Sequence, residues 1–294
     1  MGPVLFKQGT NDTMRLRVIT FLMMIILLTT SFTAFAKEIY DLESPICVKV
    51  NGTYLNMDAE PFMVNNRTYV PIRALGEALG ANVYWNAGTQ TATIQKADTT
   101  IQMQDGAAYA TVNGTKKYLE NGIKKREDRL FVPARFVAET FSAYVDWHEM
   151  SYTVNVYKDG ISVPSYLQSS RSYSDDEIFW LARIIYAESQ GEPMSGKIAV
   201  ANTVLNRVKS SEFPDTIYGV IFDRKYAVQY EPTSNGTIYN TPDAQSVAAA
   251  KRALEGESIV DDCLYFLNPR KATNSWIIRN RPYYMTIGNH DFYR

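Results

Sequence analysis

A motif that recurs at a constant distance constrains how the first half of the chain can fold. Val50-Asn51-Gly52-Thr53 recurs as Val112-Asn113-Gly114-Thr115, an offset of 62 residues (112 minus 50). The same offset relates four more pairs: Val70-Pro71 and Val132-Pro133, Arg73 and Arg135, Glu77 and Glu139, and Trp85 and Trp147. Because the pairs align without a gap, the two copies are expected to form the same structural unit.

Each copy combines strand and turn signals with one short helix. A strand ends in the Asn-Gly turn, a second strand runs into Val-Pro, a helix follows, and two strands close the unit. We expect the first helix over Ile72 to Leu79, with Pro71 at its first turn and Gly80 at its end. The closing strands are expected over 91–94 and 152–156. The sequence thus predicts a small α/β domain, a duplicated strand–helix–strand repeat, over residues 37–157, with the paired Trp and Arg side chains in structural roles.

The residues before the repeats have the features of a targeting segment. Arg15 and Arg17 form a short basic region, an apolar run extends from Val18 to Leu28, and Ala34-Phe35-Ala36 is a small-x-small cleavage site. These features predict a signal peptide over residues 1–36 and hence export of the protein. An uncleaved signal that anchors the chain in the membrane is the alternative.

After the repeats the pattern changes from strands to helices. Residues 158–173 contain Gly, Pro and several Ser without an apolar period, which is typical of a linker. Residues 174–294 contain helical periods separated by irregular segments and predict a mainly helical domain. One helix is expected to have Thr241 as its N-cap, Pro242 in its first turn and Gly256 past its end. The net charge of −1 gives no indication of a nucleic-acid partner.

The second domain opens with a helix that carries a glutamate on its apolar face. Ser174 and Glu177 have the spacing of a capping box, and apolar residues follow at helical spacing: Ile178, Leu181, Ile184 and Ile185. Glu188 falls on the same face, four residues after Ile184, shortly before Gly191 and Pro193 end the helix. A carboxyl group there is partly desolvated, which raises its pKa and suits it to general acid catalysis. A solvated glutamate at a fraying helix end is the alternative.

The residue types present limit the other chemistry that the domain can perform. A catalytic zinc needs about three protein ligands, whereas the only histidines, His148 and His290, lie in different predicted domains, so we expect no metal and no cofactor. Cys263 shares a domain with His290, but the neighbouring Asp261 and Asp262 disfavour a thiolate. Carboxylate chemistry remains. Glycoside cleavage usually uses two carboxylates, but one acid suffices if the C6 hydroxyl of muramic acid attacks C1 and forms an anhydro sugar.

Several blocks of the second domain resemble a known family. In order along the chain they are Tyr186-Ala187-Glu188-Ser189-Gln190-Gly191-Glu192-Pro193, Ala199-Val200-Ala201, Val204-Leu205-Asn206-Arg207, Phe213-Pro214, Gly219-Val220-Ile221, Tyr265-Phe266-Leu267-Asn268-Pro269, Trp276 and Ile287-Gly288-Asn289-His290-Asp291-Phe292-Tyr293. Together they resemble the SleB/CwlJ-type cell-wall hydrolases over residues 174–294. The resemblance implies a lysozyme-like fold, peptidoglycan as substrate, and members that open spore cortex as lytic transglycosylases through the glutamate aligned with Glu188.

Two further comparisons with families bear on the details. Around Lys225-Tyr226-Ala227 the cell-wall hydrolases more often have a Gln-Phe-Ser-like segment, a departure that concerns the glycan subsites and not the glutamate. The repeats resemble the copper amine oxidase N-terminal-like repeat of exported Gram-positive proteins, on their Val-Pro-x-Arg and Trp pattern. Copper sites need several imidazole or sulfur ligands, so the name of this repeat is not taken as evidence of a copper site. The repeats are expected to have a structural role, and a wall- or protein-binding module is the functional alternative.

The combined prediction is a secreted, peptidoglycan-cleaving enzyme of the cell wall or spore envelope. Glu188 is the predicted catalyst, and Glu192 the predicted structural residue at the helix end. Predicted substrate contacts are Asn206, Tyr265, Asn268, Trp276 and His290. Backbone capping, core packing or structural hydrogen bonding are the alternatives for these side chains. An N-acetylmuramoyl-L-alanine amidase and a non-catalytic wall-binding protein are the alternative functions.

Overall fold

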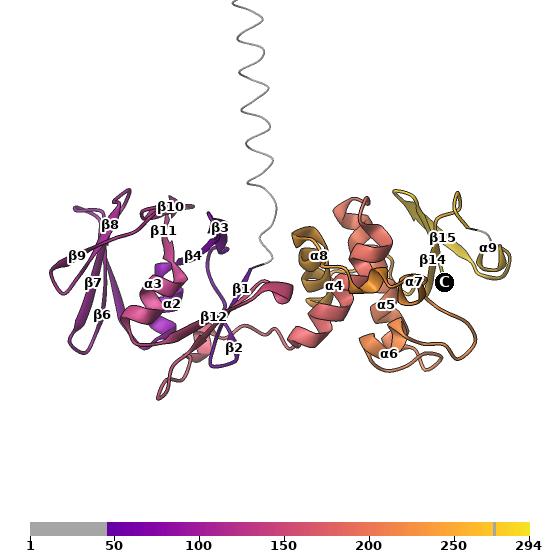
Figure 1. The fold of residues 1–294 in the computed structure, drawn as a ribbon, viewed down its shortest axis with the longest axis horizontal. Helices are drawn as coiled ribbons and strands as arrows, with labels where there is room; N and C mark the ends of the chain where they lie inside the picture. The colour runs from indigo at the N-terminus through magenta and orange to yellow at the C-terminus, as the bar shows by residue number, and fades with distance from the viewer. Residues whose placement is uncertain (1–45, 273–274) are drawn as a thin grey trace, which may run out of the picture. The chain divides into compact units, whose positions relative to one another are not determined.

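The computed structural model describes residues 46–294 except 273–274 (Figure 1). The predicted signal peptide lies outside these residues. Within the described part, no helix has both the length and the apolar composition needed to span a membrane. The described chain has a strand-rich region followed by a mainly helical one (Figure 1).

The two copies of the repeat place their elements at matching positions. The first comprises β1 (Cys47–Val50), β2 (Thr53–Tyr54), β3 (Phe62–Val64), β4 (Arg67–Pro71), α2 (Ile72–Ala78), β5 (Asn82–Asn86) and β6 (Thr91–Lys96), and β7 (Thr99–Gln104) follows. The second comprises β8 (Tyr109–Val112), β9 (Thr115–Tyr118), β10 (Lys124–Arg126), β11 (Arg129–Pro133), α3 (Ala134–Thr140), β12 (Tyr144–His148), a 3₁₀ turn (Glu149–Ser151) and β13 (Thr153–Tyr157). Each element of the second copy begins 62 residues after its counterpart.

Strands from the two copies are mixed in every sheet of this region. The sheet orders are β12-β13-β1-β2, β10-β11-β4-β3 and β5-β6-β7-β8-β9. The first strand of copy one lies parallel to the last strand of copy two, with Cys47 opposite Thr153, and β4 pairs antiparallel with β11, with Val70 opposite Val132. The helices α2 and α3 pack on β4 and β11, and buried residues from both copies form one hydrophobic core.

The two duplicated tryptophans differ in burial. Trp147 is partly buried against the core and packs edge-on against Tyr152. Its counterpart Trp85 is 42% exposed, so the expected place in the core is wrong for the first copy. The duplicated arginines Arg73 and Arg135 form exposed ion pairs with the glutamates four residues later, at 3.9 and 3.3 Å. Exposed pairs of this kind contribute little stability, typically about 0.5 kcal/mol.

Residues 158–173, predicted as a linker, are attached to the repeat region. Val163 and Leu167 are buried in its core, and a 3₁₀ turn spans Ser165–Leu167. The Asn56 amide donates to the Leu167 carbonyl (2.7 Å), and the Ser169 amide donates to the Tyr54 carbonyl (2.9 Å). Apolar residues at irregular spacing can thus anchor a segment that has no helical or strand period.

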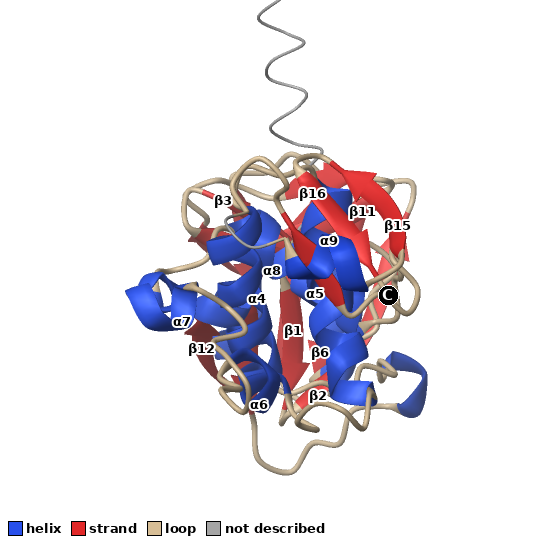
Figure 2. Ribbon diagram, turned by 90° about the vertical axis from the view of Figure 1, so that its right-hand side faces the viewer, coloured by secondary structure: helices blue, strands red, loops and turns tan. Residues whose placement is uncertain are grey.

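The helical region combines a helical layer with a small sheet. Its elements are α4 (Asp175–Ser189), α5 (Met194–Lys209), α6 (Ile217–Ile221), α7 (Pro232–Asn235), a 3₁₀ turn (Thr237–Tyr239), α8 (Ala244–Leu254), β14 (Tyr265–Leu267), α9 (Trp276–Asn280), β15 (Tyr283–Ile287) and β16 (His290–Tyr293). Helices α4, α5 and α8 pack on one another (Figure 2), and the antiparallel sheet β14-β16-β15 lies beside α5 through β14. The N-cap of α8 is Asp243, which accepts from the Ser246 amide at 2.7 Å, and not the predicted Thr241.

Helix α4 begins as the sequence indicated. The Ser174 hydroxyl accepts from the Glu177 amide (3.1 Å), and the Glu177 carboxylate accepts from the Ser174 amide (2.7 Å). The apolar face of α4 is fully buried at Ile178, Leu181 and Ile185. Burial of each such side chain stabilises the fold by roughly 1.5–3 kcal/mol, so the direction of the helix, and of the glutamate in its last turn, is firmly set.

Candidate active site

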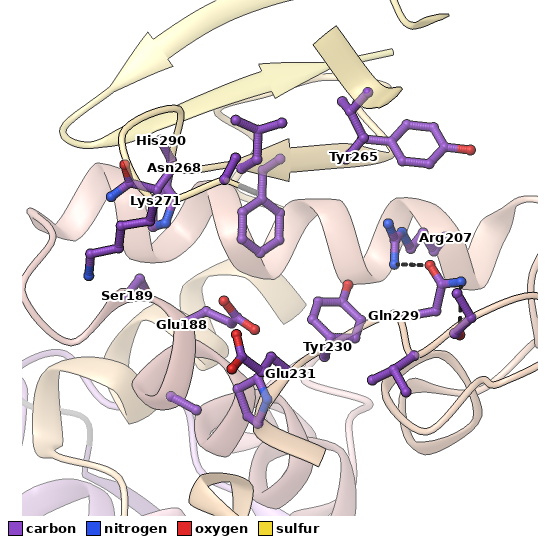
Figure 3. A pocket seen from close by; sticks show the side chains of 18 of the residues that line it. Glu188, Ser189, Arg207, Gln229, Tyr230, Glu231, Tyr265, Asn268, Lys271 and His290 are labelled. Atoms are coloured by element: carbon purple, nitrogen blue, oxygen red, sulfur yellow. Dashed lines mark hydrogen bonds between the residues drawn. The ribbon is translucent and has the colours of Figure 1, made fainter. Parts of the chain in front are cut away.

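Glu188 lies in the last turn of α4 and lines a cleft of about 1820 Å³ (Figure 3). The cleft is formed by the end of α4, the far end of α5, the loop before α7, and β14 with the residues that follow it. Its size is sufficient for several linked sugar rings or a comparable polymer segment, since pockets for single small ligands are about 300–1000 Å³. The glutamate is therefore at the surface of a polymer-sized groove.

The surroundings of Glu188 favour a protonated carboxyl group. Burial and, to a lesser extent, the negative charge of Glu231 raise the pKa of Glu188 from 4.5 to about 7, although Arg207 opposes both. Both forms of the carboxyl group are then populated near neutral pH. A group with this property can donate a proton in one step and accept one in the next.

A buried lysine fixes the end of the helix that carries the glutamate. Lys197 is fully buried, and its Nζ donates to the Ser189 carbonyl (2.7 Å) and the Gln190 carbonyl (2.8 Å). Burial lowers the pKa of Lys197, while Asp243 and Glu192 act in the opposite direction. A cation at this position satisfies the carbonyls left unpaired at a helix C-terminus and complements the helix dipole.

A second carboxylate comes into the cleft from a different part of the chain. Glu231 directly precedes α7, and its carboxylate and that of Glu188 point toward one another (Figure 3). Glu231 is exposed, but Tyr230 before it and Pro232 after it are buried. Because both neighbours are anchored, the backbone directs the Glu231 side chain into the cleft.

Arg207 connects the walls of the cleft. Its Nε donates to the Leu264 carbonyl (2.7 Å) and its Nη1 donates to Gln229 Oε1 (3.3 Å). The guanidinium carbon also lies 5.2 Å from the Tyr230 ring centroid and 5.4 Å from that of Tyr265. These contacts join α5 to the loop before α7 and to β14, so a single buried cation holds both walls in place.

Aromatic side chains line the cleft on the side of the small sheet. Arg281 Nη2 donates to the Tyr265 hydroxyl (2.7 Å), and its guanidinium carbon lies 4.4 Å from the Tyr265 ring and 5.3 Å from the Trp276 ring. Trp276 is 46% exposed, so part of its ring is accessible from the cleft. An exposed indole edge supported by stacked cations is a suitable surface for the apolar face of a sugar.

His290 and Asn268 also line the cleft, close to Lys271 (Figure 3). His290 is only 6% exposed, and its ring packs edge-on against Phe266 at 5.4 Å. Burial lowers the pKa of His290, so its imidazole is neutral at physiological pH. The Asn268 side-chain oxygen accepts from the Arg270 amide (3.0 Å), which shapes the turn after β14.

Asn206 is not among the residues that the structure brings together in the cleft. Its side-chain amide donates to the Asp261 carbonyl (2.6 Å) and the Cys263 carbonyl (3.0 Å). It thus tethers α5 to the loop before β14. The other four predicted contact residues, Tyr265, Asn268, Trp276 and His290, all line the same cleft as Glu188.

Glu192 holds the turn between β15 and β16. Its two carboxylate oxygens accept from the backbone amide and the side-chain amide of Asn289, at 3.0 and 2.9 Å. Burial acts to raise the pKa of Glu192, but these hydrogen bonds, together with nearby positive charge, outweigh it and lower the pKa. Gly288 in this turn has a φ of 59°, and a Cβ there would overlap the Glu192 carboxylate. The arrangement agrees with a structural role for this glutamate.

The thiol chemistry that the sequence made improbable also has little support from the geometry. Cys263 is fully buried, and burial followed by the charge of Asp262 raises its pKa to about 11. A thiol in these surroundings stays protonated and unreactive at neutral pH. In the described residues, no three His, Cys, Asp or Glu side chains are grouped so that they could hold a metal ion.

Both halves of the described chain are similar to known protein families. Residues 191–293 match the family described as Cell Wall Hydrolase, and residues 49–156 match the family described as Copper amine oxidase N-terminal domain. The spore cortex-lytic enzymes of Halalkalibacterium halodurans and Bacillus cereus are 40% and 38% identical over 120 and 133 residues. The helical region of this chain is thus similar in sequence to the cell wall hydrolase family and to these spore cortex-lytic enzymes.

The matches cover only parts of the proteins compared. The alignments span 41% and 45% of this chain but 35% and 48% of those two enzymes, so the chain spans less than half the length of these curated relatives. A solved structure described as the catalytic domain of a germination-specific lytic transglycosylase, SleB from Bacillus anthracis, is 38% identical. The match covers all of that chain and 43% of this one, with a TM-score of 0.39.

Four residues at the centre of the cleft were not predicted from the sequence. These are Arg207, Gln229, Tyr230 and Glu231. Gln229-Tyr230 supplies a glutamine and an aromatic residue close to the segment 225–227, where the sequence analysis placed a departure from the family. The sequence has no local signal for these residues, because the burial of Arg207 and the approach of the loop before α7 arise only in the folded chain.

Proposed function

We propose that this protein cleaves peptidoglycan as a lytic transglycosylase that cuts the bond between N-acetylmuramic acid and N-acetylglucosamine. The observation that carries the proposal is Glu188, a half-buried carboxyl group with a raised pKa, which faces a polymer-sized cleft. The match of residues 191–293 to the cell wall hydrolase family supports peptidoglycan as the substrate class.

The proposed reaction uses Glu188 twice. The protonated carboxyl group gives its proton to the glycosidic oxygen, and the bond between that oxygen and C1 of the muramic acid breaks, with the electron pair leaving on the oxygen. The C6 hydroxyl oxygen of the same muramic acid then bonds to C1, and its proton passes to the Glu188 carboxylate. The products are a shortened glycan and a 1,6-anhydro sugar, water is not consumed, and Glu188 ends protonated as it began.

We propose further that the flanking side chains bind the glycan. Trp276 and Tyr265 present aromatic rings to the sugars. Asn268 and His290, which line the same cleft, present hydrogen-bonding groups. The duplicated repeats, including the exposed Trp85, are proposed to contact the wall or a wall protein. The protein would act outside the cell, in the wall or spore envelope, after export through the predicted signal at residues 1–36.

Fragment analysis of digested peptidoglycan tests the proposal. The purified protein should release soluble fragments from vegetative peptidoglycan or spore cortex, and Glu188→Gln should release fewer than one thousandth as many. Each released glycan should end in an anhydro sugar and be one water molecule lighter than a hydrolysed fragment. Fragments with hydrolysed ends would instead indicate that the protein cleaves the same bond by hydrolysis. Release of free stem peptides would indicate an amidase, and wall binding without released fragments would indicate a binding protein.

A further inference from the structure

We infer that Glu231 is a second acidic residue of the reaction, which acts as an ionised carboxylate opposite Glu188 and stabilises the positive charge that develops at C1. The inference rests on the proposed function, because it assigns a role within that reaction. The geometry behind it is the pair of carboxyl groups that face one another across the floor of the cleft (Figure 3). The two come from separate parts of the chain, α4 and the loop that leads into α7.

The position of Glu231 is fixed by the fold, as a reacting site requires. Its own carbonyl accepts from the amides of Ser234 (2.8 Å) and Asn235 (3.1 Å), which sets the first turn of α7. Tyr230 is 2% exposed and packs against Phe266, with ring centroids 6.3 Å apart. The exposed glutamate thus stands between two anchored residues, which fix the position of its backbone at the cleft.

The two carboxyl groups have different environments, which gives them different chemistry. Glu188 is half-buried and carries a raised pKa, whereas Glu231 is exposed to the water in the cleft. Like charges at close range disfavour ionisation of the more buried partner, so an ionised Glu231 keeps the proton on Glu188. When one carboxyl group of a pair is protonated and the other is ionised, the first can act as an acid while the second stays charged.

The other charged and titratable groups around Glu188 agree with this assignment. Arg207 is the cation whose charge lowers the pKa of Glu188, and it is bound to Leu264 and Gln229. Tyr230, His290 and Lys271 also line the cleft, and the first two are buried, with pKa values shifted toward their neutral forms by burial. Glu231 is therefore the carboxylate in this cleft whose charge acts directly on Glu188.

The charge of Glu231 has a role in each half of the proposed reaction. When the glycosidic bond breaks, the electron pair leaves with the oxygen that Glu188 protonates, and C1 becomes positively charged. A nearby carboxylate lowers the energy of that state without forming a bond. When the C6 hydroxyl oxygen then bonds to C1, the positive charge is lost and Glu188 takes up the hydroxyl proton. Glu231 stays ionised throughout, so atoms and charges balance as in the reaction without it.

The test compares Glu231→Gln with Glu212→Gln in the full chain. Glu212 is an exposed glutamate that lines the same cleft, so its replacement removes an equal charge at a different place. With soluble peptidoglycan fragments, Glu231→Gln should lower kcat at least tenfold while KM changes less than threefold. It should also move the alkaline limb of the kcat profile to lower pH by roughly 0.5–1 unit, because Glu188 loses its proton more easily. Glu212→Gln should change neither quantity more than twofold.

A third variant separates charge from shape. Glu231→Asp keeps the carboxylate on a shorter side chain, so it should retain the alkaline limb of the unmodified protein and more activity than Glu231→Gln. If Glu231→Gln and Glu212→Gln have the same kcat and the same pH profile, Glu231 has no part in the reaction. Failure of the proposed function itself is distinct, because the unmodified protein would then release no glycan fragments at any pH.

Discussion

Replacement of Glu188 by glutamine should stabilise the protein at neutral and alkaline pH while it abolishes activity. In the folded protein, burial and the charge of Glu231 raise the pKa of Glu188 from 4.5 to about 7. For an acid whose pKa is higher in the folded state, the stability is fully present below the unfolded value. It declines between about pH 4.5 and 7, and the loss is complete above pH 7.

The size of the effect follows from the two pKa values. Their difference of about 2.5, at about 1.4 kcal/mol for each pKa unit, corresponds to about 3.5 kcal/mol. Glutamine has nearly the same shape and no charge, so it removes most of this cost, although its amide is also desolvated. The free energy of unfolding of Glu188→Gln should therefore exceed that of the unmodified protein by about 3 kcal/mol at pH 8, and by less than about 0.5 kcal/mol at pH 4.

Thermal unfolding across a series of pH values measures the difference. With a change in Tm of roughly 2–4 °C per kcal/mol for a chain of this size, the variant should melt about 6–12 °C higher at pH 8 and at nearly the same temperature at pH 4. Glu212→Gln, which removes an exposed carboxylate from the same cleft, is the matched control and should leave Tm within about 2 °C at both values. A Tm gain that is equal at pH 4 and pH 8, or absent at pH 8, would refute the argument that burial holds Glu188 protonated.

Three further predictions concern the frame of the site. Lys197→Met removes two hydrogen bonds from a buried cation to carbonyls at the end of α4, so it should lower the free energy of unfolding by about 2–4 kcal/mol in chemical denaturation, whereas the exposed Lys209→Met should lower it by less than about 0.5. Gly288→Ala places a Cβ against the Glu192 carboxylate at a positive φ, and should destabilise by more than about 2 kcal/mol; an unchanged Tm would contradict the described turn. Trp276→Ala should raise KM for glycan fragments about tenfold with kcat within threefold, because it removes binding surface distant from the reacting bond; an unchanged KM would exclude the indole as a sugar platform.

The sequence correctly predicted those helices and strands whose caps and apolar spacing involve residues close together in the chain. The capping box at Ser174 and the apolar stripe through Ile185 correctly predicted the helix that bears Glu188, because both depend on residues three or four apart. The N-cap of α8 was misplaced by two residues, since Thr241 and Asp243 are both good N-caps and only the fold selects between them. The expected closing strands and the first short helix were each within two residues of those observed.

The parts of the site that depend on distant contacts had no such signal. Glu231 lies in an irregular loop without a period, and contacts distant in the sequence, such as the packing of Tyr230 against Arg207 and Phe266, bring it to Glu188. For Asn206 the sequence left two roles open, a substrate contact and a backbone cap. An asparagine on a helix has the same pattern in both cases, and the structure shows its amide bound to two backbone carbonyls. The lysozyme-like character of the helical region and the residues that bind glycan stay predictions.

The mixing of strands in the repeat region has a consequence for how that region unfolds. Because β1 pairs with β13 and β4 with β11, one copy alone would leave the edges of its strands open and part of the shared core exposed to water. The two copies are therefore expected to unfold together in one cooperative transition, and a cut between them should leave neither copy as a stable domain.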